Sequence, residues 1–325
     1  MNSFITTLYP SVDLIDSVVF KDTNSEENIY FSKPFLKAFE ISNPQIEFKY
    51  ISISDADKNT LALALVQVIS LNVEGMLKNI KVAPLVRKGL GLLFCNEHIK
   101  IMFCGNVFLS GEHGISTAET SSKKDIYSEI GTALDAVAAN TKPMHAIFIK
   151  DFKLASLVHT QAFLNFGYSE IKVEPNMIIQ LKPEWKTFED YKNILKSKYR
   201  VKANKADSKS STLETRLFSD QDLETYKHEL QALYQNTIDK ASFNAQVLNL
   251  DTYSHLSASL KDNFIVKGYF LENRLVGFLT ALVNDNKLDA HFIGLDYELN
   301  KSHAIYPRIL NDYIRIGIEK QVDSI

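Results

Sequence analysis

The sequence predicts an α/β (α+β) protein made of two tandem units, each a mostly antiparallel mixed sheet flanked by helices. Two observations favour this class: strand-like segments joined by short polar turns are followed by an amphipathic helix, and this order occurs in both halves of the chain. A chain of 325 residues with 45% apolar and 23% charged side chains is long enough for one large domain or two ordinary ones.

The second half predicts a three-stranded antiparallel meander. Residues 264–271 and 275–283 are apolar-rich and flank the turn 272–274, and a second turn at 284–286 leads into 288–296. A polar loop is expected after this meander, over residues 298–303.

Helices are predicted on both sides of the meander. After it, four apolar residues at offsets 0, 4, 8 and 11 form one helical face: Ile305, Ile309, Tyr313 and Ile316. Upstream, Ser219 and Asp222 are a capping pair for a helix over 219–236, and Asp251 can cap a shorter helix.

The first half shows the same order. Strands are predicted at 48–53, 61–71 and 99–108, and the third contains Phe103-Cys104-Gly105 where the second half has Phe292-Ile293-Gly294. The following helix repeats the offsets 0, 4, 8 and 11, with Ile126, Ile130, Leu134 and Val137. We interpret the halves as two copies of one unit, the first carrying a ten-residue insertion in or beside residues 111–114.

The first copy has a continuation that the second lacks. It comprises a strand at 146–150, a helix at 154–166 closed by Gly167, and apolar-rich pieces at 169–173 and 177–181. The second copy stops at Ile325, where its corresponding strand should begin. Either the chain is shorter than its relatives, or something else completes the second unit.

The charge distribution places the domain boundary. The net charge is -3, with 36 Lys and Arg against 39 Asp and Glu, which argues against a nucleic-acid binder that uses its whole surface. Residues 182–209 nevertheless hold nine basic and four acidic side chains, a local +5. We therefore expect units at 1–182 and 183–325, and either a solvated helix face or a phosphate-contacting patch in this basic segment.

Several classes of protein are excluded by what the chain lacks. The apolar run 61–71 is far shorter than the roughly 20 residues of a membrane span, and residues 1–20 have no basic start typical of a secretory signal. Cys95 and Cys104 are too few for a disulfide framework or a zinc cage, so we expect small buried side chains and no metal. The predicted location is the cytoplasm.

The meander, polar loop and helix, preceded by two short helices, resemble the core of the GNAT acyltransferase superfamily. The duplication, the segments 185–191 and 198–200, and Gly105-Asn106 followed by Ser110-Gly111 resemble its FemAB-like branch. The resemblance implies acyl transfer from a carrier, usually acyl-coenzyme A, to an amine. Fem-type members instead take the group from aminoacyl-tRNA and pass it to a cell-wall precursor.

The resemblance also implies a donor site in the second unit. The carrier arm would pair with the splayed strand and the pyrophosphate would meet the loop after it, where unpaired N–H groups and a positive helix end favour anions. The implied cofactor-binding residues are Phe292, Ile293, Gly294, Leu295, Asn300, Lys301, Ser302, His303 and Ala304. The superfamily loop signature contains glycines, whereas this loop has none.

Candidate catalytic residues lie at the mouth of the second unit. An attacking amine must be neutral, so a general base is expected near the strand, and the departing group needs a proton. Asp296, His291 and Tyr306 are the candidates, with Tyr297 and His303 beside them. The alternatives are structural: Asp296 could start a turn or cap, His291 could be a hydrogen-bonded sheet residue, and Tyr306 could pack the helix start.

The first unit carries a possible acceptor loop, with substrate-binding candidates Asn106, Ser110, Glu112 and His113, or an ordinary glycine turn. The favoured function is an N-acyltransferase with its donor in the second unit, its acceptor between the units, and a small-molecule or cell-envelope precursor as the amine. Two alternatives stay open: Fem-type transfer from aminoacyl-tRNA held by the basic segment, and a degenerate GNAT fold used as a non-catalytic binding module.

Overall fold

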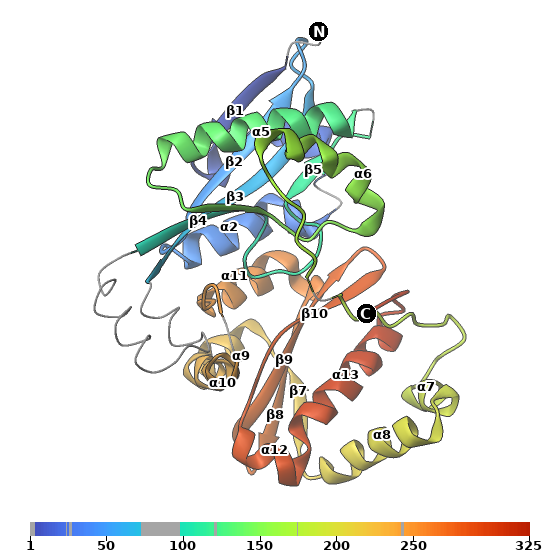
Figure 1. The fold of residues 1–325 in the computed structure, drawn as a ribbon. Helices are drawn as coiled ribbons and strands as arrows, with labels where there is room; N and C mark the ends of the chain where they lie inside the picture. The colour runs from blue at the N-terminus through green and yellow to red at the C-terminus, as the bar shows by residue number, and fades with distance from the viewer. Residues whose placement is uncertain are drawn as a thin grey trace, which may run out of the picture. The chain divides into compact units, whose positions relative to one another are not determined.

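The computed structural model describes residues 4–23, 25, 28–72, 98–119, 122–173, 175–241 and 244–325. Cys95 lies outside these residues. The chain forms two compact units, shown in Figure 1. Unit 1 contains Met1–Asn176 with Ser242–Leu248, and unit 2 contains Met177–Ala241 with Asn249–Ile325.

Unit 1 contains a mixed sheet in the order β1-β2-β3-β4-β6, with β5 paired to β3. Its strands are β1 (Ile5–Tyr9), β2 (Glu47–Ser54), β3 (Thr60–Asn72), β4 (His98–Cys104), β5 (Ile115–Thr117) and β6 (Ala146–Ile149). All pairs are antiparallel except β4 with β6. The predicted hairpin of β2 and β3 is confirmed, whereas β4 ends at Cys104, four residues earlier than expected, because Gly105 turns the chain at φ +133°.

Helices cover the sheet of unit 1. They are η1 (Val12–Leu14), α1 (Ser17–Asp22), η2 (Ile29–Phe31), α2 (Lys33–Ser42), α5 (Lys123–Asn140), η3 (Leu154–Ser156), α6 (Leu157–Thr160) and η4 (Gln161–Phe166). The four apolar residues predicted for one face of α5 are all buried in a core that includes Val66 and Met102. The helix expected at 154–166 is instead three short pieces, although Gly167 does end them in the left-handed conformation, at φ +80°.

Unit 2 contains an antiparallel sheet in the order β10-β9-β8-β7. Its strands are β7 (Glu214–Leu217), β8 (Phe264–Leu271), β9 (Arg274–Asn284) and β10 (Lys287–Leu295). The predicted meander is therefore confirmed, with each end within one residue of its expected place. Alternating small turns and apolar strands make this part of the chain easy to interpret.

The helices of unit 2 are α7 (Phe188–Ile194), α8 (Ser197–Lys209), α9 (Asp220–Thr225), α10 (Lys227–Lys240), α11 (Asp251–Leu260), η5 (Lys261–Asn263), α12 (Tyr297–His303) and α13 (Ile305–Glu319). The single helix expected at 219–236 is divided at Tyr226, but its Ser219/Asp222 capping box is confirmed. Asp251 lies inside the first turn of α11, whose N-cap is Leu250. The four predicted apolar residues of α13 are all buried.

The sheet of unit 2 is extended by short bridges at the C-terminal end of the chain. Ser324 pairs in parallel with Lys287 of β10 and antiparallel with Gln180. Ile179 and Leu181 donate their N–H groups to Ile325 and Asp323 at 2.8 Å. The apolar piece 177–181, which the sequence assigned to the first copy, thus pairs with the last residues of the second. The piece 169–173 forms no strand.

The two units share one order of elements. In each, an edge strand is followed by helices, three antiparallel strands, a long amphipathic helix and a parallel partner for the last of the three strands. That parallel partner is β6 in unit 1 and the single residue Ser324 in unit 2. No described helix is long and apolar enough to cross a membrane, and no group of His, Cys, Asp and Glu among the described residues is arranged to hold a metal.

Candidate functional site in unit 2

A β-bulge interrupts β10 at two of the candidate residues. Ala290 pairs with Ala281 and Ile293 pairs with Leu279, so His291 and Phe292 together oppose Thr280. The buried Thr280 hydroxyl donates to the Phe292 carbonyl at 2.8 Å and lies 3.4 Å from His291 Nδ1. Bulges of this kind redirect side chains and are frequent next to active sites.

Beyond the bulge, the outer edge of β10 faces α10 rather than a strand. The N–H of Asp296 donates to Val276 of β9, so by antiparallel alternation the peptide groups of Ile293 and Leu295 point away from β9. The Leu295 carbonyl accepts from Asn236 Nδ2 at 3.2 Å, and the Ile293 carbonyl lies 3.2 Å from Thr237 Oγ1, whose single proton is shared with the Tyr234 carbonyl at 2.7 Å. This edge is the one to which the family resemblance assigns the carrier arm.

Gly294 lets α10 approach β10 closely. A Cβ atom at this position would lie 2.7 Å from backbone atoms of Leu233 and Tyr234, and 2.3 Å from the Phe278 ring. The glycine of the Phe-Ile-Gly segment is therefore required by packing between α10 and the sheet.

The predicted polar loop at 298–303 is wrong: these residues belong to the helix α12. Asp296 is its N-cap, and one carboxylate oxygen accepts from the N–H groups of Glu298 at 3.0 Å and Leu299 at 3.2 Å. The other oxygen accepts from Arg274 at 2.6 Å. Both oxygens of this carboxylate are thus engaged by donors, one of them at a helix start, which is the arrangement of a helix cap.

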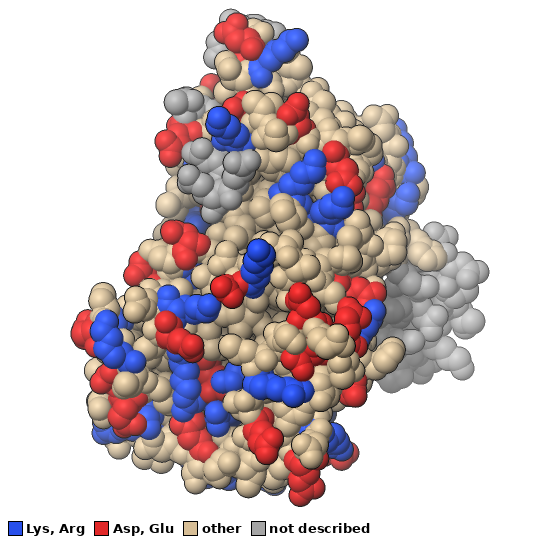
Figure 2. All heavy atoms as spheres, turned by 180° about the vertical axis from the view of Figure 1, so that it is seen from behind, with Lys and Arg blue, Asp and Glu red and all other residues tan. Residues whose placement is uncertain are grey.

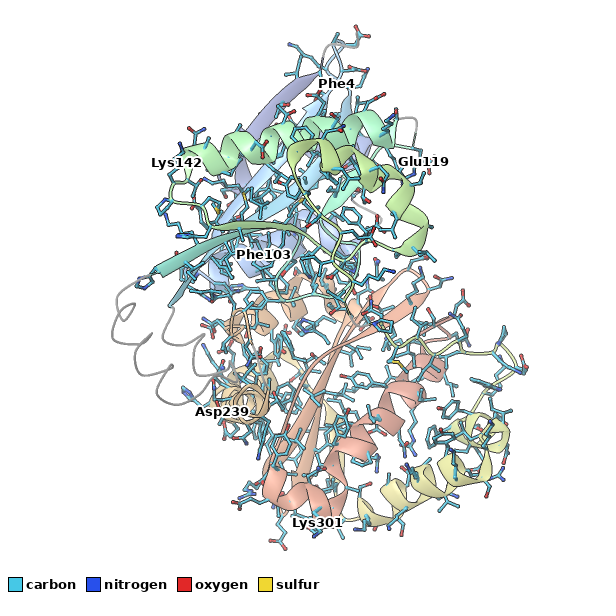
Figure 3. The ribbon with its side chains drawn as sticks, in the orientation of Figure 1. Phe4, Phe103, Glu119, Lys142, Asp239 and Lys301 are labelled. Atoms are coloured by element: carbon cyan, nitrogen blue, oxygen red, sulfur yellow. The ribbon has the colours of Figure 1, made fainter. Side chains whose placement is uncertain are left out.

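The remaining residues expected to bind phosphate hold the α12–α13 junction together. Asn300 Oδ1 accepts from the N–H of Tyr306 at 2.8 Å, at the start of α13. Ser302 donates to Leu299 within α12, and His303 Nδ1 lies 3.3 Å from Thr212 Oγ1. Ala304 joins the two helices in the left-handed conformation, at φ +48°. Lys301 is exposed and labelled in Figure 3, and its carbonyl accepts from Lys209.

Two of the tyrosine candidates lie near each other at this junction. Tyr297 and Tyr306 are 39% and 44% exposed, and Lys240 of α10 lies over the Tyr297 ring at 5.4 Å. Partial burial raises the pKa of Tyr297, and the neighbouring Tyr306 raises it further. His291 is at the bulge instead, and its ring packs against Phe292 in a tilted arrangement with 4.3 Å between ring centroids. The candidates thus form two groups along β10.

A buried ionic network fixes α13 to the sheet and to α8. Asp312 is fully buried and its carboxylate binds Lys267 at 2.9 Å, Arg308 at 2.9 Å and Arg315 at 2.6 Å. Arg315 also reaches Asp207 of α8 at 2.6 Å. Burial by itself would raise the pKa of Asp312, but Lys267 and Arg308 outweigh it and the net shift is downward. This network was not predicted from the sequence, although Arg308, Asp312 and Arg315 have helical spacing.

Helix α8 has an inner side that packs against α13 and an outer side that carries basic residues. Its inner side holds Ala203, Ala206 and Asp207 against α13, where Asn311 donates to Asp207 at 2.9 Å. Its outer side carries an exposed stripe at spacings of four, three and four residues: Lys198, Lys202, Lys205 and Lys209. In α7, Tyr191 packs against the core of unit 2, whereas Ile194 is 55% exposed. On the face drawn in Figure 2, acidic and basic side chains are interspersed.

In unit 1, the loop that follows β4 is held by one contact within the loop and by contacts with distant segments of the unit. Asn106 is buried and its side-chain oxygen accepts from the N–H of Phe108 at 3.0 Å. Glu112 accepts from Lys153 N at 3.2 Å and Ser156 Oγ at 2.8 Å. The His113 ring packs on Tyr30 at 4.0 Å. Of the four acceptor candidates, Ser110 is the exposed one.

The side chain of Lys150, the residue directly after β6, binds the same loop. Its ammonium group donates to the carbonyls of Asn106 at 3.2 Å and Leu109 at 2.5 Å, and it pairs with Asp151. Gly105 makes room for this lysine, since a Cβ there would lie 2.6 Å from Lys150 Cγ. Burial raises the pKa of the nearby Cys104 thiol to about 12, as suits the small buried residue expected from the sequence.

Comparison with known proteins gives a fold and no closer relationship. No model of a protein family and no curated protein matches the sequence. Among solved structures, the crystal structure of FemX matches with a TM-score of 0.54 and 10% identity, over 95% of this chain and 87% of that one. The structure of L-PGS from Bacillus licheniformis matches with a TM-score of 0.51 and 12% identity, over 95% and 74%. The chain therefore shares the fold of these two structures.

Proposed function

We propose that this protein is a transferase that moves an acyl group from a carrier to an amine, with the carrier bound along the outer edge of β10. Acyl-coenzyme A is the proposed donor, and an amine of a small molecule or a cell-envelope precursor is the proposed acceptor. The main support is the geometry of β10: a bulge at His291 and Phe292, then a strand edge whose peptide groups at Ile293 and Leu295 point away from β9.

The edge of β10 offers the contacts that an amide-containing carrier arm needs. In an antiparallel strand the N–H and C=O of one residue point the same way, so Ile293 and Leu295 present both a donor and an acceptor along this edge. Asn236 and Thr237 of α10 already bind the two carbonyls. A bound arm would either share these carbonyls or replace the two side chains.

The chemistry needs one base and one acid. The amine nitrogen attacks the thioester carbonyl carbon and loses a proton to the base, after which the carbon–sulfur bond breaks and the thiolate takes a proton from the acid. We propose His291 as the base because it lies in the bulge, and Tyr306 as the acid because it is exposed beside the end of β10. Asp296 is a positioning residue, since it caps α12 and binds Arg274.

The test combines donor binding with turnover. A panel of acyl-coenzyme A thioesters is expected to raise the melting temperature, and release of free thiol with an amine acceptor reports transfer. His291→Gln should lower kcat with little change in donor binding, whereas His255→Gln, on the exposed side of α11, should change neither. Absence of both a melting shift and thiol release across the panel would contradict the proposal. Binding without turnover would favour the non-catalytic module.

A specific observation favours a second candidate, transfer from aminoacyl-tRNA. The helix starts expected to hold a pyrophosphate are filled by Asp296 and by Asn300, which is unfavourable for coenzyme A. On α8, Lys198, Lys202 and Lys205 make no ion pair with any described residue, so these charges are available to a phosphate backbone.

The lysine stripe provides the test of this second candidate. Replacing Lys198, Lys202 and Lys205 with Gln should weaken tRNA binding and reduce its dependence on salt. The matched control replaces three exposed lysines of unit 1 with Gln: Lys123, Lys124 and Lys142. Equal effects of the two triple variants would show a non-specific charge effect and remove this candidate.

A further inference from the structure

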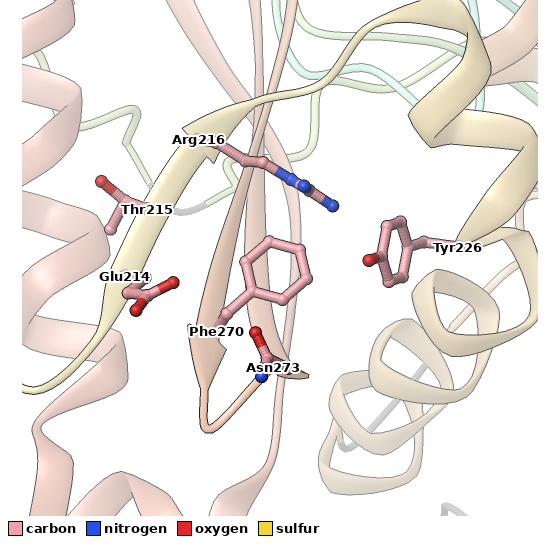
Figure 4. A pocket seen from close by; sticks show the side chains of 6 residues that line it. All are labelled: Glu214, Thr215, Arg216, Tyr226, Phe270 and Asn273. Atoms are coloured by element: carbon pink, nitrogen blue, oxygen red, sulfur yellow. The ribbon is translucent and has the colours of Figure 1, made fainter.

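A shallow hollow of about 140 Å³ lies at the edge of the unit 2 sheet, away from β10. Figure 4 shows the six residues that line it: Glu214, Thr215, Arg216, Tyr226, Phe270 and Asn273. They come from the edge strand β7, from the junction of α9 and α10, and from the β8–β9 hairpin. None of them belongs to the proposed transfer site, so a ligand bound in the hollow would not depend on the proposed function.

Two opposite charges stand on the same face of β7 without pairing with each other. Glu214 and Arg216 are two residues apart on the strand, which places their Cα atoms about 7 Å apart. Arg216 makes its ion pair with Asp222 instead, at 3.3 Å. A guanidinium has five N–H donors, and this ion pair occupies one of its nitrogens while the side chain stays 48% exposed. The hollow therefore presents a cationic and an anionic end.

Aromatic rings hold the cationic end in place. The Arg216 guanidinium lies 4.6 Å from the centroid of Phe270, 5.2 Å from Tyr226 and 5.8 Å from Phe218. In Figure 4 the Phe270 ring lies between Arg216 and Asn273, and the Glu214 carboxylate is turned toward it. An arginine stacked on rings is preorganised, so it loses little side-chain entropy when it binds an anion.

We propose that this hollow binds a free α-amino acid with an apolar or aromatic side chain. The ligand carboxylate would accept from Arg216, its ammonium would donate to Glu214, and its side chain would lie on Phe270 and Tyr226. In a free amino acid the ammonium and the carboxylate are both attached to the α-carbon, so one small ligand can present an anion to Arg216 and a cation to Glu214 at the same time. The volume of the hollow, about 140 Å³, is that of a small ligand.

Calorimetric titration with three probes tests the assignment. L-phenylalanine carries both charges, phenethylamine carries only the ammonium, and 3-phenylpropionate carries only the carboxylate. L-phenylalanine is expected to bind at least tenfold more tightly than either analogue, because a charged hydrogen bond contributes about 1.5–3 kcal/mol and tenfold corresponds to about 1.4 kcal/mol.

Two variants assign each charge to its partner. Arg216→Gln should weaken binding of L-phenylalanine and 3-phenylpropionate while leaving phenethylamine unchanged. Glu214→Gln should weaken binding of L-phenylalanine and phenethylamine while leaving 3-phenylpropionate unchanged. Glu272→Gln removes an exposed carboxylate from the adjacent hairpin turn and should change none of the three affinities. If Arg216→Gln fails to fold, Arg216→Lys keeps the charge, loses the planar fork, and should weaken carboxylate binding partially.

Three results would overturn the proposal. They are the absence of L-phenylalanine binding to the unaltered chain, binding of a single-charge analogue as tight as that of L-phenylalanine, and an equal loss of affinity in Glu272→Gln and Glu214→Gln. The crossed pattern of losses would support it, and loss of acyl-donor binding at β10 would leave it unaffected because the two sites share no residue.

Discussion

In unit 1 the third strand of the meander, β4, pairs with β6 over four residues. Within the part of the chain that the structure describes, the corresponding strand of unit 2, β10, meets a parallel partner at Ser324 alone. Lys150 then closes the gap beyond β4 by binding two loop carbonyls. Beyond the bulge of β10, the outer carbonyls are bound by two side chains of α10. One order of elements thus produces a strand edge paired with another strand in unit 1 and, in unit 2, an edge whose outer carbonyls are contacted by side chains of α10.

The difference shows where ligand chemistry is possible in a fold of this kind. Backbone groups paired in a sheet ladder are unavailable to a ligand, but those bound by side chains can exchange partners at a cost of about 1 kcal/mol per hydrogen bond. The closed edge in unit 1 therefore suits a structural role. The edge of β10 suits exchange with a carrier arm.

The largest expected effect is on the network that holds α13 in unit 2. Asp312→Ala leaves Lys267, Arg308 and Arg315 without their buried carboxylate, and we expect a loss of about 3–5 kcal/mol of unfolding free energy. Trp185, the one tryptophan of the chain, is buried in the unit 2 core and reports this in urea-induced unfolding followed by fluorescence. Asp125→Ala on the exposed side of α5 should leave this transition unchanged.

The lowered pKa of the Asp312 carboxylate predicts that the stability of unit 2 depends on pH. The pKa of Asp312 is lower in the folded protein than in the unfolded chain, so its contribution to stability is present above the unfolded value of about 3.9 and is lost as pH falls through the folded value. In Asp312→Asn, the unfolding free energy reported by Trp185 fluorescence should fall less steeply as the pH is lowered. An unchanged fall in this variant would assign the acid sensitivity to other groups.

Packing of α10 on β10 gives the next largest effect. Gly294→Ala forces a Cβ into the backbone of α10, and we expect a loss of about 1–3 kcal/mol together with displacement of Thr237 from Ile293. Gly167→Ala is the control because its position has open space around it and only the left-handed backbone resists the change. Equal losses in both variants would mean that backbone conformation, not contact with α10, explains Gly294.

Lys150→Met tests the comparison in unit 1. It keeps the apolar stem but removes the donor to Asn106 and Leu109, and we expect a loss of about 2 kcal/mol. Amide hydrogen exchange in residues 106–111 should accelerate, while exchange in β10 stays the same. Unchanged exchange in the loop would show that Lys150 does not close it.

Thr237→Val tests the comparison in unit 2 and has the smallest expected effect on stability. Valine keeps the branched shape and removes the hydroxyl that binds the Ile293 carbonyl, so stability should fall by about 1 kcal/mol. A donor that uses this carbonyl should then bind up to about tenfold more tightly, because it satisfies a group left without its partner. Unchanged donor affinity would place the carrier elsewhere.

The strands and the long helices were predictable because their signals are local. Alternating apolar strands and short turns predicted the bounds of the meander strands to within one residue. The apolar residues at helical spacing in α5 and α13 are buried as expected. The helix α12 was missed because its polar residues have no apolar period. Its start depends on the Asp296 cap, a residue that its sequence position alone suggests as a candidate base.

Contacts between distant segments were not predictable from one sequence. The pairing of residues 177–181 with the end of the chain joins segments about 145 positions apart, and nothing in either segment indicates the other. The partners of the site candidates were equally unpredictable. Asp296, Asn300 and Glu112 were selected for their chemistry, but the sequence does not show which residues they bind. In the structure these partners are Arg274, Tyr306 and Ser156.

Backbone hydrogen exchange with and without donor tests the central claim most directly. With saturating acyl-coenzyme A or aminoacyl-tRNA, we expect slower exchange of the Ile293 and Leu295 amides in β10 and no change in the β4 amides of residues 101–104. Protection of β4 with β10 unchanged, or no protection in either strand with any donor, would contradict the assignment of the carrier to the edge of β10.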